Sequence, residues 1–181
     1  MRWPKLTLPL ACGIAIGAGA LAAAQFTGIF MLTPDLSEPG FTEELVVTAQ
    51  DQHGWAMLIL GVSALALLVV CLWFDLARDG ESGAVSQTAA VALAVTGLVA
   101  LLIFLIIDVP DANRIGALGN ETGSFVDAKA TPQLGFWLEL LGSALLVGCG
   151  STLAYSSLTE AYASGPEDGA DEPALGGQSG A

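Results

Sequence analysis

The chain has 181 residues, of which 54% are apolar and 13% charged, and its 5 basic and 18 acidic side chains give a formal net charge of −13. Soluble domains carry about 25% charged residues, so the low charged fraction and a mean hydropathy of +0.67 favour a chain solvated by lipid. The few Lys and Arg side chains cannot neutralise a row of phosphates, which excludes a nucleic-acid partner.

Four long apolar runs predict four transmembrane helices, because about 20 residues at a rise of about 1.5 Å cross a hydrocarbon core of about 30 Å. In chain order the runs are 8–32, 54–74, 88–107 and 134–155. Backbone polar groups in lipid must be paired within their own segment, so each run is expected to be helical. We therefore predict an all-α fold, a polytopic four-transmembrane-helix bundle over residues 8–155.

The segments outside the runs predict the topology. Residues 1–7 form a short N-terminal tail whose Arg2 and Lys5 flank the first run, which favours a cytoplasmic N-terminus. Residues 156–181 form an acidic tail that is expected to be disordered and cytoplasmic. Tryptophan favours the membrane boundary, and all four tryptophans lie at predicted span ends: Trp3, Trp55, Trp73 and Trp137. The expected location is the cell membrane, as a multi-pass protein.

The first run also has features of a cleaved signal peptide. It follows a basic start and contains the small residues Ala22, Ala23 and Ala24 before Gln25. Apolar character resumes at once over residues 26–32, which favours a retained helix. Cleavage remains the alternative.

Small residues predict where the helices pack, because lipid provides no hydrophobic drive for their association and close backbone contact must replace it. The packing positions are Gly13, Gly17, Gly61, Gly97 and Gly142. The same faces would serve a homo-oligomer or contact with another membrane protein, and both stay open.

The second and fourth runs carry a glycine pair at the same spacing, Gly54 with Gly61 and Gly135 with Gly142, which points to two parallel two-helix repeats.

Motifs for catalysis are missing from the sequence. A single histidine excludes a zinc site with two or more imidazoles, and neither a Gly-x-Ser-x-Gly elbow nor a Gly-rich phosphate loop occurs. Cys12, Cys71 and Cys149 lack a C-x-x-C spacing and are interpreted as packing residues. We predict no metal, no cofactor and no enzyme activity.

Ionisable residues gather near the predicted outer ends of the runs. They are His53, Asp108, Asp111, Arg114 and Glu139. Glu139 lies inside the fourth run, where an acid is costly unless it faces water, a partner or the interior of the bundle. It is interpreted as an interfacial carboxylate that is solvated by headgroups or paired with Arg114 or Lys129, as a proton- or cation-handling group together with His53, or as a helix–helix contact. The second interpretation requires Glu139 and His53 within about 6 Å of each other.

These observations predict a small integral membrane protein that acts through lipid and protein contacts, as a structural or accessory component. Its first partner is the lipid bilayer. The alternative is a transport or ion-conducting component that uses the outer polar cluster.

Overall fold

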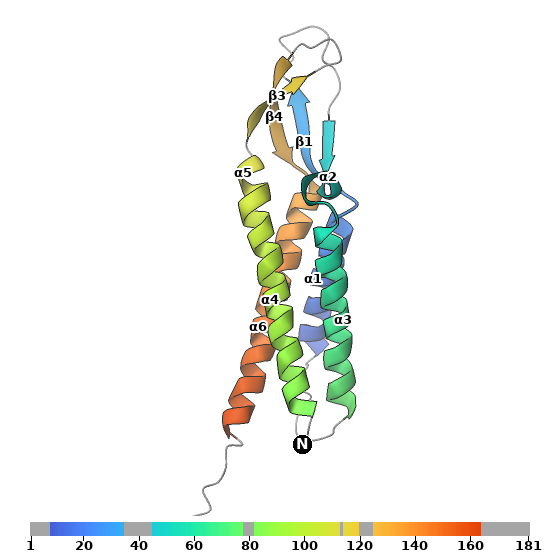
Figure 1. The fold of residues 1–181 in the computed structure, drawn as a ribbon, viewed down its shortest axis with the longest axis vertical. Helices are drawn as coiled ribbons and strands as arrows, with labels where there is room; N and C mark the ends of the chain where they lie inside the picture. Colours follow the sequence, from blue (N-terminus) through green and yellow to red (C-terminus); the bar gives the residue numbers. More distant parts are fainter. Residues whose placement is uncertain (1–7, 35–44, 78–81, 113, 120–124, 164–181) are drawn as a thin grey trace, which may run out of the picture.

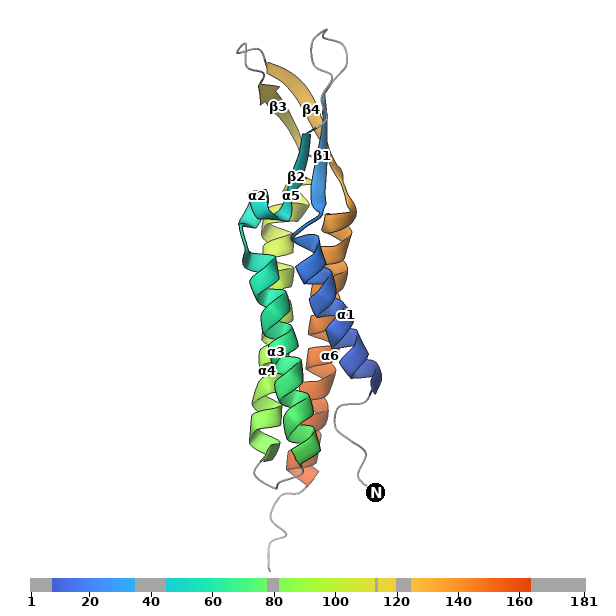
Figure 2. The ribbon, with the colours of Figure 1, turned by 90° about the vertical axis from the view of Figure 1, so that its right-hand side faces the viewer.

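The computed structural model describes residues 8–34, 45–77, 82–112, 114–119 and 125–163. The fold is mostly helical, with four long helices side by side and a four-stranded sheet at one end of them (Figure 1) (Figure 2). The predicted N-terminal tail and the part of the acidic tail beyond Ala163 lie outside the described residues.

The four long helices are α1 (Leu8–Ala24), α3 (Ala56–Ala77), α4 (Ser82–Ile103) and α6 (Leu134–Ala163). Both α1 and α4 pack against α3 and against α6. Within the described ranges, three helical stretches are long and apolar enough to cross a membrane: Ala56–Phe74, Gln87–Asp111 and Leu134–Ser156. With 17 residues, α1 is shorter than these three.

The first predicted span is wrong beyond Ala24, where α1 ends. A turn follows, in which the hydroxyl of Thr27 donates to the carbonyl of Ala24 at 3.0 Å, and strand β1 (Gly28–Pro34) begins. Ile29 and Phe30 of β1 are buried against the helices. The run is apolar throughout because a buried strand directly follows a membrane-type helix, and hydropathy alone does not separate the two.

The sheet combines β1, from the first apolar run, with three strands from the segments between the predicted spans. β1 pairs with β2 (Leu45–Thr48) and with β4 (Phe125–Pro132), and β4 pairs with β3 (Ile115–Gly119). All pairings are antiparallel, in the order β2-β1-β4-β3. The all-α prediction therefore describes the helices and misses the sheet, because short strands with mixed polar and apolar residues give a weak sequence signal.

The other predicted spans begin or end at different residues from the helices that overlap them. α3 continues past residue 74, and α6 continues past residue 155, so the first part of the predicted tail is helical. α4 is followed by a π-helical turn, η1 (Phe104–Asp108), and by the short α5 (Val109–Asp111). The amide of Val109 donates to the carbonyl of Phe104, one residue further back than in an α-helix. Such π-turns occur frequently at functional sites.

Two apolar clusters fill the interior. The larger one lies between the long helices and includes Ile14, Leu21, Met57, Leu93 and Leu146. The smaller one lies where the helices meet the sheet and includes Ile29, Phe30, Phe104, Ala112 and Phe136. The ring of Phe136 lies 5.9 Å from that of Phe30 and 4.7 Å from that of Phe104. These aromatic contacts join the sheet to η1 and α6.

The five glycines predicted at helix contacts all lie where a neighbouring helix comes close. A Cβ atom on Gly97 would lie 2.6 Å from the backbone nitrogen of Val147, and one on Gly142 would lie 2.7 Å from the carbonyl oxygen of Gly17. Real Cβ atoms do not approach backbone atoms so closely, so no side chain fits between these helices. The sequence analysis missed Gly150, which faces the backbone of α4 in the same way.

The predicted two-helix repeat is not supported by the packing. Two equivalent helix pairs would place Gly61 and Gly142 against different helices. Both instead face α1, since their Cβ atoms would meet the carbonyl oxygens of Ala18 and Gly17. In the sheet, β1 is central whereas β3, the first strand of the other half, lies at the edge. The shared glycine spacing reflects close helix packing in both halves rather than two-fold symmetry.

Candidate functional site

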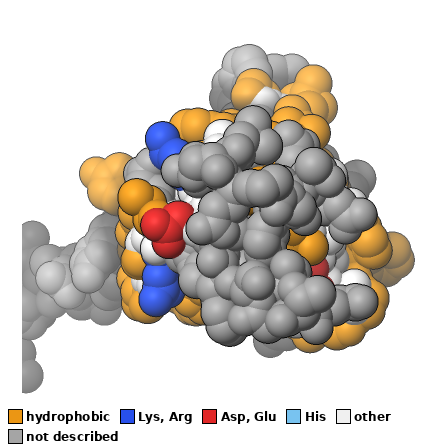
Figure 3. All heavy atoms as spheres, turned by 90° about the horizontal axis from the view of Figure 1, so that it is seen from above, with side chains coloured by type: hydrophobic (Ala, Val, Ile, Leu, Met, Phe, Trp, Pro, Cys, Tyr) orange, Lys and Arg blue, Asp and Glu red, His pale blue; other side chains and the backbone are white. Residues whose placement is uncertain are grey.

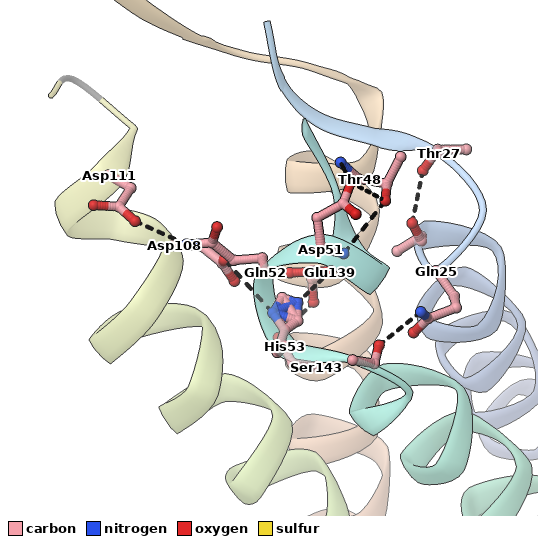
Figure 4. Close-up of polar contacts among 12 residues, drawn as sticks. Gln25, Thr27, Thr48, Asp51, Gln52, His53, Asp108, Asp111, Glu139 and Ser143 are labelled. Atoms are coloured by element: carbon pink, nitrogen blue, oxygen red, sulfur yellow. Dashed lines mark hydrogen bonds and ion pairs between the residues drawn. The ribbon is translucent and has the colours of Figure 1, made fainter. Parts of the chain in front are cut away.

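Three buried ionisable side chains meet where the long helices join the sheet (Figure 4). His53 ends the short helix α2 (Ala49–His53), Asp108 ends η1, and Glu139 lies near the start of α6. Nε2 of His53 lies 3.1 Å from Oε1 of Glu139, and Nδ1 of His53 lies 3.9 Å from Oδ1 of Asp108. The imidazole therefore stands between two carboxyl groups that come from different elements. We call these three residues the buried triad.

The buried triad is withdrawn from solvent. The side chains of Asp108 and Glu139 are 0% exposed and that of His53 is 4% exposed. Among the described residues, no hydrogen-bond partner is found for either carboxylate oxygen of Asp108, for Oε2 of Glu139 or for Nδ1 of His53. Buried polar atoms are nearly always paired, and each unpaired group costs about 1–3 kcal/mol. The buried triad thus has donor and acceptor positions that further partners could fill.

Helix α2 positions His53. The hydroxyl and the amide of Thr48 both donate to Oδ2 of Asp51, at 2.7 and 3.1 Å, and the amide of Asp51 donates back to the hydroxyl of Thr48 at 3.4 Å. This capping box fixes the start of α2. Gly54 ends it with φ of 61°, a left-handed value that favours glycine. The carbonyl of Gly54 accepts from Nε2 of Gln25 at 2.7 Å, which ties the end of α2 to the end of α1.

The two carboxyl groups are placed by the helices that carry them. The buried hydroxyl of Ser143 donates to the backbone carbonyl of Glu139 at 2.7 Å, within the same helix. Asp108 is the last residue of the π-turn, and Asp111 lies in α5 immediately beyond it. Asp108 is buried, whereas Asp111 is partly exposed. The π-turn therefore lies at the point where Asp108 faces the interior and Asp111 stays near the surface.

Burial lowers the pKa of His53 below its ordinary value, and the nearby charge of Asp108 opposes this shift in part. The imidazole is therefore neutral near pH 7. A neutral imidazole keeps one ring nitrogen able to accept a hydrogen bond or to bind a metal ion. Hydrogen bonds from Thr48 lower the pKa of Asp51, so the capping carboxylate stays ionised.

Asp111 and Arg114, also predicted as members of the polar cluster, lie apart from the buried triad. Oδ1 of Asp111 accepts from Nη1 of Arg114 at 3.2 Å, and its Oδ2 accepts from Nε2 of Gln52 at 2.8 Å. The side chain of Arg114 is 73% exposed. A shallow groove of about 180 Å³ lies here, lined by Phe30, Leu32, Val47, Gln52, Asp111, Arg114 and Ala130.

The sequence analysis grouped His53, Asp108 and Glu139 correctly at one end of the helices, and the distance between His53 and Glu139 meets the required 6 Å. The interfacial interpretation of Glu139 differs from the structure, in which its partner is His53 rather than Arg114 or Lys129. Sequence reasoning missed Gln25, a buried polar residue whose one signal is its place inside an apolar run.

The donors of the buried triad are one imidazole nitrogen and two carboxyl groups, and one ligand atom from each residue lies within 4.8 Å of the other two. Such a set can share protons or hold a cation. Comparisons with protein-family models, curated proteins and solved structures found no match to this chain. Its function is therefore inferred from the contacts, burial and charges of its own residues.

Proposed function

We propose that this chain is an integral membrane protein in which α1, α3, α4 and α6 form a four-span transmembrane bundle. It acts as a structural or accessory component, without catalysis of its own, and holds its sheet at the outer surface of the cell membrane. Both termini are then cytoplasmic. The observation that carries the proposal is the apolar outer surface of the helices.

Large apolar side chains cover the outside of the long helices. Exposed fractions reach 62% at Ile59 and Val69 of α3 and 70% at Ile106 of η1. Viewed from above the sheet, hydrophobic side chains lie around the rim of the molecule, and most of the visible acidic and basic side chains lie on one side (Figure 3). A helix in water is apolar on one face only, whereas a helix that is apolar all round is buried or lies in lipid. Lipid contact accounts for these exposed residues.

Tryptophans support two membrane boundaries. Trp55 and Trp137 lie at the sheet end of α3 and α6, and Trp73 lies near the other end of α3. Their exposed fractions are 51%, 57% and 72%. At about 1.5 Å per residue, Trp55 and Trp73 are about 27 Å apart along the helix, close to the thickness of a hydrocarbon core. Trp favours both faces of such a core.

α1 is proposed as the fourth span although it is short. Its length is about 25 Å, and a bilayer adapts to a short helix at modest cost by local thinning. Its exposed residues include Leu8 and Ile16, both apolar. Its close contact with α6 at Gly17 and Gly142 supports a retained helix rather than a cleaved signal peptide.

The sheet provides surfaces for protein contacts. Within the described residues, β2 and β3 are edge strands, and Leu45 and Val46 of β2 are about half exposed at 51% and 52%. Edge strands carry unpaired backbone groups that can pair with another chain. An accessory role would use these edges against another membrane protein or a second copy of this chain.

Cysteine labelling in intact cells tests the topology. The native cysteines are replaced by alanine, and single cysteines are introduced by Leu8→Cys, Asp127→Cys and Thr159→Cys, all at exposed positions. Leu8 and Thr159 lie at the end of the helices that faces away from the sheet, and Asp127 lies in the sheet. A membrane-impermeant maleimide is therefore expected to label the Asp127→Cys variant alone.

Permeabilised cells serve as the control, since all three variants should then react. Labelling of the Leu8→Cys variant from outside would show that α1 does not cross the membrane. Labelling of the Thr159→Cys variant but not the Asp127→Cys variant would reverse the proposed orientation.

A second candidate function, handling of a cation or a proton, is favoured by the 3.1 Å contact between buried His53 and Glu139. Translocation needs a polar route through the helices as well. The described side chains between the helices, such as Leu21, Leu93 and Leu146, form an apolar core. The arrangement therefore favours holding a charge at the buried triad over passing it across the membrane.

A further inference from the structure

We propose that His53, Asp108 and Glu139 bind a divalent transition-metal ion. One imidazole nitrogen and one oxygen from each carboxyl group would be the protein ligands, and water would complete the coordination. The site is formed by α2, η1 and α6, so it does not depend on how the sheet meets a partner.

The charge of the buried triad supports a cation. Two carboxyl groups lie side by side with no exposed surface, and isolated buried carboxylates are costly unless they are paired or coordinate a metal. The basic side chains among the described residues, Arg114 and Lys129, are exposed, and Arg114 is paired with Asp111. Nearby positive charge from lysine or arginine is therefore missing in the described part of the chain. A divalent ion would balance two carboxylates.

The unpaired atoms support the same conclusion independently. Both oxygens of Asp108 and Oε2 of Glu139 lack a hydrogen-bond partner among the described residues although they are buried. Nδ1 of His53 is likewise buried without a hydrogen-bond partner among the described residues. A metal ion would satisfy oxygen and nitrogen lone pairs that hydrogen-bond donors leave unused.

The donor set selects the class of ion. Imidazole suits zinc, iron, copper and nickel, whereas magnesium and calcium prefer oxygen ligands alone. Carboxylate ligands in turn suit zinc and manganese better than soft ions such as copper(I). One nitrogen and two carboxylates therefore favour a first-row divalent ion, and Zn²⁺ and Mn²⁺ are the probes of choice.

The geometry needs a modest adjustment. Zinc bonds to nitrogen and oxygen are about 2.0–2.2 Å long, so the ligand atoms of a tetrahedral site lie about 3.3–3.6 Å apart. The ligand atoms of the buried triad lie within 4.8 Å of one another. Rotation of the carboxyl groups, which moves an oxygen atom by about 1 Å, would close the site. Because the ligands come from three elements, a bound ion would link α2 to η1 and α6.

Metal binding is tested on the full chain purified in mild detergent. The protein is treated with a chelator, loaded with zinc chloride, freed of excess metal and analysed by inductively coupled plasma mass spectrometry and titration calorimetry. One zinc ion per chain is expected. X-ray absorption at the zinc edge should show imidazole scattering and a nitrogen and oxygen shell, without the sulfur shell at about 2.3 Å that the three cysteines would give.

Variants of the buried triad locate the ion. Asp108→Asn and His53→Gln are expected to weaken zinc affinity by at least about 100-fold. Removing a residue that only hydrogen-bonds to a metal ligand costs up to about 100-fold, and removing a ligand itself should cost at least as much. Asp111→Asn is the matched control, because this acid lies three residues away in the same segment and pairs with Arg114 instead. It should keep the native affinity.

Zinc binding that both variants of the buried triad retain would overturn the proposal, as would absence of both zinc and manganese binding to the native chain. A sulfur shell in the absorption spectrum would also overturn it. The spectrum is taken on the native chain, so it decides the matter even where a variant does not fold.

Discussion

Replacing His53 with leucine is expected to lower the free energy of unfolding by about 1–3 kcal/mol, the cost of leaving a buried polar group without its hydrogen-bond partner. The imidazole contacts Glu139 at 3.1 Å and faces Asp108, and both carboxyl groups are 0% exposed. Without His53, the carboxyl group of Glu139 loses its hydrogen-bond partner, and the two acids remain buried side by side. Unfolding of the chelator-treated protein in detergent micelles measures the loss.

A triple variant separates this electrostatic effect from packing. Combining His53→Leu with Asp108→Leu and Glu139→Leu replaces the whole buried triad by apolar side chains, which is often neutral or stabilising for buried charged groups. The triple variant should therefore be more stable than His53→Leu alone. Gln52→Leu is the control, because it removes a hydrogen bond to Asp111 outside the buried triad and should cost about 0.5–1.5 kcal/mol. Equal stability of the native chain and the His53→Leu variant would contradict the arrangement of these side chains.

The second large effect is expected at Gly97, where α4 meets α6. A Cβ atom there would lie 2.6 Å from the backbone nitrogen of Val147 and 2.7 Å from the Cβ atom of Leu146. Backbone atoms cannot move aside as a flexible side chain can, so the helices must separate. Gly97→Val is expected to cost about 1–3 kcal/mol through overpacking, measured by thermal unfolding in detergent.

Two other helical glycines provide matched controls. A Cβ atom on Gly148 of α6 or on Gly19 of α1 would meet nothing within 4 Å. The same substitution by valine at these positions should change stability by no more than about 0.5 kcal/mol, as exposed substitutions usually do. If Gly97→Val behaved like the controls, α4 and α6 would not be in backbone contact.

The sequence located the long helices because their apolar runs carry at most one charge and are long enough to cross a membrane core, which is typical of transmembrane helices. It failed within the first run, where Gly28–Pro34 continues the apolar pattern of α1 as a central strand. Both a transmembrane helix and a buried strand are apolar throughout, and the difference lies in pairing with β4, more than ninety residues away along the chain. No local pattern records that pairing.

For the site, the sequence placed Glu139 and His53 at the same end of the molecule. It could not show that the acid faces the imidazole, because this depends on α2, a helix of 5 residues held by a capping box. Nor could it show that Asp108 points inward and Asp111 does not, since the π-turn between α4 and α5 sets that difference. The single histidine excludes a site with two imidazoles, yet two carboxylates can supply the remaining protein ligands of a metal ion.

We propose that α1 packs inside the membrane as a fourth helix along α6. The Cβ atom of residue 13 would lie 3.9 Å from the Cβ atom of Cys149, within the range of about 3.5–4.5 Å that a disulfide needs. In a chain whose Cys12 and Cys71 are replaced by alanine, in native membranes treated with a permeant oxidant, the Gly13→Cys variant should form an intramolecular disulfide with Cys149. The bond is seen as the loss of two hydrogen atoms by mass and the loss of maleimide reactivity. Gly19→Cys, which faces no neighbour, should not. A reduced Gly13→Cys variant, or one linked only between chains, would contradict the account.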